Sequence, residues 1–298
     1  MSEQASGGGL GGGQPGGLPG TARLTPYELA FMEGDFETRV FPGIQAEAEE
    51  HREDPSRRSR FAFLSLAGDA VREMVPPDAP PDMLAEYRAL LYHAFNFWRY
   101  GRRLYLLDAP VARYLVEGAP TLEGWDLAAP LPSVYLQLPA NLFWASISTD
   151  VPPEPVDGFF VTVGDRTDAG DEAYQELQVL MVLGIRRERP GFSVIAFETE
   201  AGPGIPTVWV ETPGREEGHD FENVLPGGEI AGLYSILTTA EALKLVARAL
   251  WYIDRHAEDV TQAPAPERRA SDRPGSVPLS RIDFHQVRFP AAGNGSGA

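Results

Sequence analysis

The sequence predicts an α+β fold, with N-terminal helices, a central antiparallel β-sheet and a C-terminal helix that covers the sheet. Three observations support this prediction. The hydrophobic period changes from about 3.6 residues to 2 near Arg103. Short, turn-rich segments separate the alternating stretches that follow, and they favour antiparallel neighbours because a parallel crossover needs a dozen or more residues. The helical period then returns after Thr238.

The N-terminal part begins with glycine-rich sequence over residues 1–22, which we expect to be a disordered tail. Order is expected from Thr25, because Thr25-Pro26-Tyr27-Glu28 has the pattern of a capping box. In that pattern a threonine precedes a proline at the first helical position and a glutamate at the third. Helices are expected over residues 26–33, 35–52 and 59–75.

The strongest helical pattern covers Pro81–Tyr100. Large apolar side chains recur there at spacings of three and four residues and define one buried stripe: Leu84, Tyr87, Leu91, Phe95 and Trp98. Gly101 supplies a stop signal, since glycine readily adopts the left-handed conformation that ends many helices. A short strand over Arg103–Leu107 and a short helix over Ala109–Val116 are expected next.

Five strand-like stretches follow. They are Val134–Leu138, Phe159–Val163, Leu177–Ile185, Phe192–Phe197 and Thr207–Glu211. The stretch Leu177–Ile185 is apolar on both faces, because Leu180 and Val182 lie between its alternating apolar residues. It is therefore expected in the centre of the sheet with both faces covered.

The C-terminal part starts with a second capping box at Thr238, which opens a helix expected to end near His256. Residues 258–279 are rich in proline, alanine and serine and indicate a linker. Residues 280–290 alternate and are expected to dock as a short strand on a sheet edge, and residues 291–298 to be disordered. The prediction is thus one α+β domain over residues 23–257, with this strand attached to it.

Composition excludes several kinds of site. The chain has no cysteine, so disulfides, thiolate nucleophiles and cysteine-based metal sites are ruled out. None of the five histidines lies at metal-ligand spacing from another, and we expect no metal and no cofactor. Apolar runs are far shorter than the roughly 20 residues that span a bilayer, so we expect a cytoplasmic protein with no membrane partner.

The net charge of −18 is concentrated in the second half of the chain. Residues 150–229 hold 17 acidic residues against five arginines. Such a surface repels nucleic acid, so no sequence-specific DNA binding is expected. Acidity serves solubility in many proteins. It also fits a basic protein partner, and an acidic nucleic-acid mimic is one alternative interpretation.

Two features are candidate sites. If the protein is an enzyme, a hydrolase or transferase for example, dispersed residues would act, and the candidates are His219, Asp220 and His93. The other feature is a basic and aromatic cluster at the end of the strongest helix: Trp98, Arg99, Tyr100, Arg102 and Arg103. Stacking rings beside cations are typical of RNA contacts, including contacts on a ribosome. The alternative is a helix end with cations at its dipole and aromatic side chains in the core.

Three segments resemble a family of phage and plasmid proteins that is similar to a type V-A anti-CRISPR protein. They are Leu131–Pro139, Gly158–Val161 and Leu243–Ile253, in this order. Arg248 stands where the last family motif has asparagine, which is a departure. The resemblance implies a non-enzymatic regulator that recognises a nascent or folded protein target and lowers its expression or activity. It transfers no catalytic residues.

Overall fold

The computed structural model describes residues 24–31, 34–51, 64–117, 120, 122, 125, 132–146, 152–167, 173–186, 191–201, 239–265 and 281–290. The helices in this part are α1 (Pro26–Phe31), the π-helical η1 (Phe36–Val40), α2 (Phe41–Glu50), α3 (Ser65–Met74), α4 (Pro81–Arg99), α5 (Ala109–Glu117), α7 (Thr239–Arg255) and the 3-10 helix η4 (Ala257–Asp259). The strands are β1 (Arg103–Leu107), β2 (Ser133–Gln137), β3 (Trp144–Ala145), β4 (Glu154–Thr167), β5 (Ala173–Arg186), β6 (Gly191–Ala201), β7 (Val260–Gln262) and β8 (Asp283–Val287). None of the described helices is long and apolar enough to cross a bilayer.

The described strands form one mixed sheet in the order β6-β5-β4-β2-β1-β8-β7, with β3 paired to β4. The predicted α+β class is confirmed, and β2, β4, β5 and β6 are antiparallel neighbours as expected. β1 differs, since it runs parallel to both β2 and β8. The chain between β1 and β2 contains α5, which gives it the length that a parallel crossover needs.

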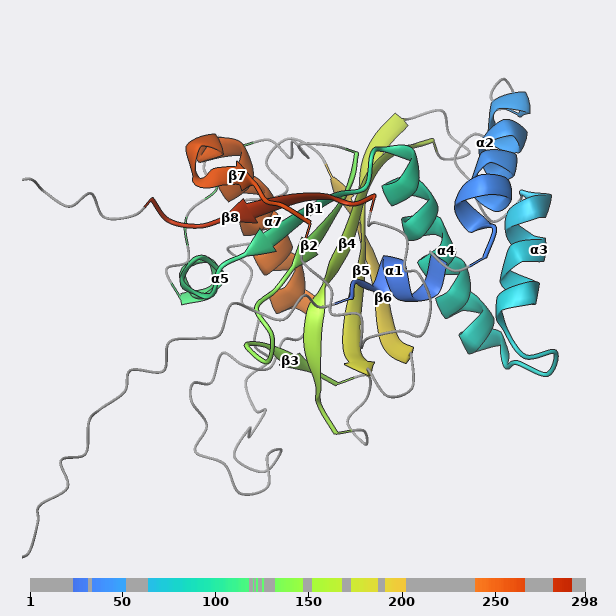
Figure 1. Cartoon of the computed structure of the whole chain (residues 1–298), viewed down its shortest axis with the longest axis horizontal. Helices are drawn as coiled ribbons and strands as arrows, with labels where there is room; N and C mark the ends of the chain where they lie inside the picture. The colour runs from blue at the N-terminus through green and yellow to red at the C-terminus, as the bar shows by residue number, and fades with distance from the viewer. Residues whose placement is uncertain are drawn as a thin grey trace, which may run out of the picture.

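Helices cover both faces of the sheet (Figure 1). On one face α1, α2, α3 and α4 pack around Phe160, Leu180 and Val182. On the other face α5 and α7 pack around Phe159 and Val179. β5 contributes alternate residues to the two cores, as its two-sided apolar pattern predicted. The sheet therefore lies between two apolar layers and contributes side chains to both.

The capping box at the start of α1 forms as predicted. The Glu28 backbone N–H donates to Thr25 Oγ1 at 3.2 Å, and the Thr25 N–H donates to Glu28 Oε2 at 2.9 Å. Both residues are buried beneath the helical layer, so these bonds satisfy polar groups that water does not reach.

The C-terminal strand lies inside the sheet, whereas its sequence predicts a strand docked at a sheet edge. β8 runs between β1 and β7, and Phe284 and Val287 are buried on opposite faces. β7 falls in the stretch expected to be a linker, and it takes the place next to β8. The expected strand Thr207–Glu211, the glycine-rich tail and the last eight residues lie outside the described residues. The domain boundaries stay predictions.

Candidate functional site

The basic and aromatic cluster begins where α4 ends. The Arg102 N–H donates to the Phe97 carbonyl at 2.7 Å and the Gly101 N–H to the Trp98 carbonyl at 3.3 Å. This pair of bonds is the Schellman arrangement, which turns the chain sharply after the last helical residue. Gly101 has φ 93° and Arg102 φ 58°, so an arginine as well as a glycine occupies the left-handed region. The turn aims Arg102 away from its helix toward the N-terminal helices.

Two cations of the cluster form ion pairs within the protein. Arg102 Nη1 lies 3.2 Å from Glu37 Oε1, and its Nε donates to the Arg281 carbonyl. Arg103 Nε lies 3.1 Å from Asp283 Oδ2. These contacts join the end of α4 to η1 and to the start of β8. Arg102 and Arg103 thereby connect three segments that are far apart in the sequence.

The remaining members of the cluster divide between core and surface. Trp98 is half-buried and packs on Phe41, with ring centroids 5.6 Å apart. Arg99 is exposed and lies over the Tyr100 ring, 5.5 Å from its centroid. Of the predicted stacking surface, the exposed Arg99 and the half-buried Tyr100 thus form a cation–aromatic pair. RNA binding by this cluster stays a prediction.

Glu37 is the centre of this ion-pair network. It accepts a hydrogen bond of 2.6 Å from the Tyr27 hydroxyl and lies within 3.5 Å of Arg281 as well as Arg102. Burial and the bond to Glu37 raise the pKa of Tyr27, so the phenol stays protonated and acts as a donor. Desolvation alone would raise the pKa of Asp283, but His285 and Arg103 outweigh it and lower that pKa.

His93 is buried between α4 and the sheet. Its Nδ1 lies 3.0 Å from Thr162 Oγ1, which in turn lies 3.2 Å from the Ser133 hydroxyl. Burial lowers the pKa of His93 to about 3, so the imidazole is neutral at physiological pH. This chain of polar groups satisfies buried atoms within a mostly aromatic layer. His219 and Asp220 lie outside the described residues, so a catalytic role of these three residues stays an untested alternative.

Arg248 of α7 is a buried cation. Its Nη1 donates to the Leu115 carbonyl at 2.8 Å, which satisfies an end group of α5. Burial lowers the pKa of this guanidinium. Among the described residues, the Nε atom of Arg248 has no hydrogen-bond partner. The same part of the chain contains no group of three or more potential metal ligands. The arginine that departs from the family motif thus joins the two helices behind the sheet.

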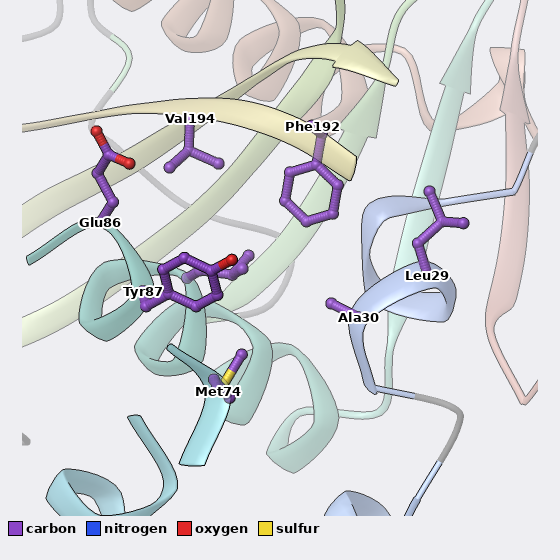
Figure 2. Close-up of a pocket in the computed structure, with 8 residues that line it drawn as sticks. Leu29, Ala30, Met74, Glu86, Tyr87, Phe192 and Val194 are labelled. Carbon is purple, nitrogen blue, oxygen red and sulfur yellow. The ribbon is translucent and has the colours of Figure 1, made fainter. Parts of the chain in front are cut away.

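A cavity of about 330 Å³ opens between the helical layer and β6. Its lining comes from four elements and consists of Leu29, Ala30, Met74, Glu86, Tyr87, Leu90, Phe192 and Val194. Figure 2 shows the Phe192 ring descending from β6 and the Tyr87 ring rising from α4, with Leu29 and Ala30 of α1 on one side. Glu86 lies on the side away from α1. Apolar and aromatic side chains thus line the cavity together with one carboxylate, that of Glu86.

The sequence does not predict this cavity. Tyr87 belongs to the stripe predicted to be buried on α4 but is only partly buried, and Phe192 lies in β6, in a stretch predicted to be a strand. No local motif marks the cavity, because α1, α3, α4 and β6 each contribute only one to three lining residues. The sequence offers only a weak indication of the cavity, which is that Glu86 interrupts the apolar residues around it on α4.

Comparisons with known proteins give a distant structural similarity. No protein-family model matches the chain, and no curated protein sequence matches it. Among solved structures, the crystal structure of AcrVA2, a type V-A anti-CRISPR protein, aligns with 88% of this chain and 81% of that chain. The TM-score is 0.43 and the sequence identity 14%.

Proposed function

We propose that this chain is a non-enzymatic regulatory protein that binds a protein target through the cavity between α1, α4 and β6. The observation that carries the proposal is the lining of this cavity, which combines apolar side chains with the single carboxylate of Glu86. Its volume of about 330 Å³ lies at the lower end of the range of binding pockets in proteins. A cavity of this size accommodates one or two large side chains.

The lining defines the chemistry of the target segment. Phe192, Tyr87 and Met74 favour an apolar side chain, whose burial stabilises a complex by about 1.5–3 kcal/mol. Glu86 favours a neighbouring ammonium or guanidinium group. The net charge of −18 favours the approach of basic polypeptides over a long range. A target therefore presents an apolar residue next to a positive charge.

The consequence of binding is inferred from the sequence motifs. Leu131–Pro139 and Leu243–Ile253 resemble segments of the family similar to a type V-A anti-CRISPR protein. In that family the regulator recognises a nascent or folded protein and lowers its expression or activity. We extend the same consequence to this chain.

The test compares variants that fill the cavity with variants of equal size outside it. Ala30→Trp places a large side chain in the cavity, whereas Ala85→Trp adds the same side chain at an exposed position of α4. Each variant and the wild type are immobilised and used to capture proteins from the cells of origin. We expect one target that the wild type and Ala85→Trp retain equally and that Ala30→Trp retains at least tenfold less.

A second pair of variants tests the charge. Glu86→Gln should weaken capture of the same target, and Asp82→Asn, which removes an exposed carboxylate elsewhere on α4, should not. Coexpression with the wild type should then lower the amount or activity of that target, and coexpression with Ala30→Trp should not. Equal capture by wild type and Ala30→Trp would refute the proposed binding site.

A further inference from the structure

Five aromatic rings meet at the other end of the molecule, around the C-terminal end of α7. They belong to Tyr114 of α5, to Trp251, Tyr252 and His256 in and after α7, and to Phe289 after β8. Ring centroids are 5.7 Å apart for Tyr114 and Phe289, 6.1 Å for Phe289 and Tyr252, 4.4 Å for Tyr252 and His256, and 5.5 Å for Trp251 and His256. We call this continuous set of rings the aromatic belt.

Two large hydrophobic residues of the belt are exposed. Phe289 is 39% exposed and Tyr114 37%, and they are two of the three exposed large hydrophobic residues in the described part of the chain. The third, Leu66, lies on α3. Exposed apolar residues scattered singly are common, but two in ring contact over further aromatic side chains are typical of an interface.

The belt is held in place by hydrogen bonds beneath it. The buried Tyr252 hydroxyl donates to Asp259, and the Arg288 N–H donates to the Asp259 carbonyl at 3.1 Å. Asp259 thus fixes both the central ring and the backbone next to Phe289. An ordered surface loses little conformational entropy when a partner binds.

The charges beside the belt are balanced, unlike those of the whole chain. Six exposed charged residues neighbour the belt in sequence: Arg113, Arg255 and Arg288, and Glu117, Asp254 and Glu258. The whole chain has 25 basic and 43 acidic residues. An isologous contact brings a patch against its own copy, so a patch of one sign would repel itself. A patch with equal numbers of both signs can pair each cation with an anion of the second copy.

We propose that the aromatic belt is the surface through which two copies of this chain form a two-fold symmetric dimer. Phe289 and Tyr114 of each copy form the apolar centre, and the six charged residues form a mixed rim, the arrangement typical of protein interfaces. Nucleic acid does not fit this surface, since the patch has no excess of cations.

The position of the belt keeps the proposed binding cavity accessible. Figure 1 shows α5, α7 and the end of β8 on one side of the molecule and α3 and α4 on the other. The cavity is lined from α1, α3, α4 and β6, none of which contributes to the belt. A dimer formed through the belt would therefore leave the cavity of each copy uncovered.

Sedimentation velocity of the purified full chain over a range of concentrations tests the proposal. We expect the weight-average mass of the wild type to rise from that of one chain toward that of two. Phe289→Ala and Tyr114→Ala should each raise the dimer dissociation constant about tenfold or more, the range of an interface hot spot. Leu66→Ala, which truncates the exposed residue outside the belt, should leave the dissociation constant unchanged.

Charge reversal provides an independent measurement. Arg288→Glu leaves four negative charges and two positive charges beside the belt of each copy. If the belt is the interface, the two patches then repel each other, so the substitution should weaken the dimer. Urea unfolding checks that each variant is folded at the concentrations used. A wild type that stays monomeric at all concentrations, or a dimer equally stable in Phe289→Ala and Tyr114→Ala, would overturn the proposal.

Discussion

The imidazole of His93 is held between α4 and the sheet as a neutral group. Its Nδ1 is hydrogen-bonded to the Thr162 hydroxyl, which is in turn hydrogen-bonded to the Ser133 hydroxyl. The Phe160 ring stacks beside the imidazole, with ring centroids 6.4 Å apart. Charging the imidazole in this place would leave a cation in an apolar layer, which is why burial lowers its pKa to about 3. At the residue scale, His93 therefore makes stability depend on pH.

We expect acid to destabilise the wild type more than the variant His93→Gln. The unfolded histidine has a pKa of about 6.5, so between pH 6.5 and 3 the unfolded chain binds a proton that the folded chain does not. Stability from this group is complete above pH 6.5 and falls as the pH decreases. The difference in free energy of unfolding between the wild type and His93→Gln should change by about 2 kcal/mol from pH 7 to pH 5.

Urea unfolding at several pH values measures this change. His93→Gln keeps a polar side chain near Thr162 but has no proton to gain in this range, so effects of the acidic surface are common to both proteins. A difference in free energy of unfolding that stays constant from pH 7 to pH 5 would contradict the prediction.

At the scale of secondary structure, the sequence predicted the elements whose signal is local. α4 is marked by its apolar spacing and its terminal glycine, α1 by its capping box, and β5 by its two-sided alternation. β3 and β7 have only two and three residues and carry no periodic signal. The position of β8 between β1 and β7 depends on contacts with distant segments, which a local pattern does not contain.

The same reasoning explains which parts of the candidate site could be predicted. The cluster Trp98–Arg103 is contiguous and was found, but its internal partners Glu37 and Asp283 are far away in sequence. The cavity is assembled from four elements and has no contiguous part that stands out. Its residues became recognisable only when the fold brought them together.

The interior position of β8 leads to a prediction about stability. Phe284 is 3% exposed and packs in the layer of the N-terminal helices, so Phe284→Ala should lower the free energy of unfolding by about 3–5 kcal/mol. Phe289 follows the same strand but is 39% exposed, so Phe289→Ala should cost less, about 1 kcal/mol, from the lost ring contacts with Tyr114 and Tyr252. Urea unfolding measures both values, and similar costs for the two variants would contradict the interior placement of β8.

At the scale of the whole molecule, the sheet couples two apolar layers. β5 supplies Val179 to one layer and Leu180 to the other. Unfolding of this strand would therefore disrupt the packing of both layers. Turn signals and periodicity predicted a covering helix but not that the N-terminal helices pack on the opposite face. Which face a helix covers is decided by tertiary contacts.

We therefore expect one cooperative unfolding transition. Leu91→Ala in the layer of α4 and Leu250→Ala in the layer of α7 remove fully buried side chains and should each cost about 2–5 kcal/mol. Each should shift the transitions seen by circular dichroism and by tryptophan fluorescence together. Two separate transitions, of which each substitution moves only one, would show that the layers unfold independently.

The location of β8 also constrains how the chain is made. Arg103 at the start of β1 and its partner Asp283 are separated by 180 residues. During synthesis, β1 can pair with β8 only after the intervening residues have left the ribosome. Strand pairings between segments so distant in sequence also form slowly. Until then one side of β1 presents unpaired backbone groups, which invites pairing with other chains. Pairing with β8, the last described strand, therefore covers this side of β1 only late in synthesis.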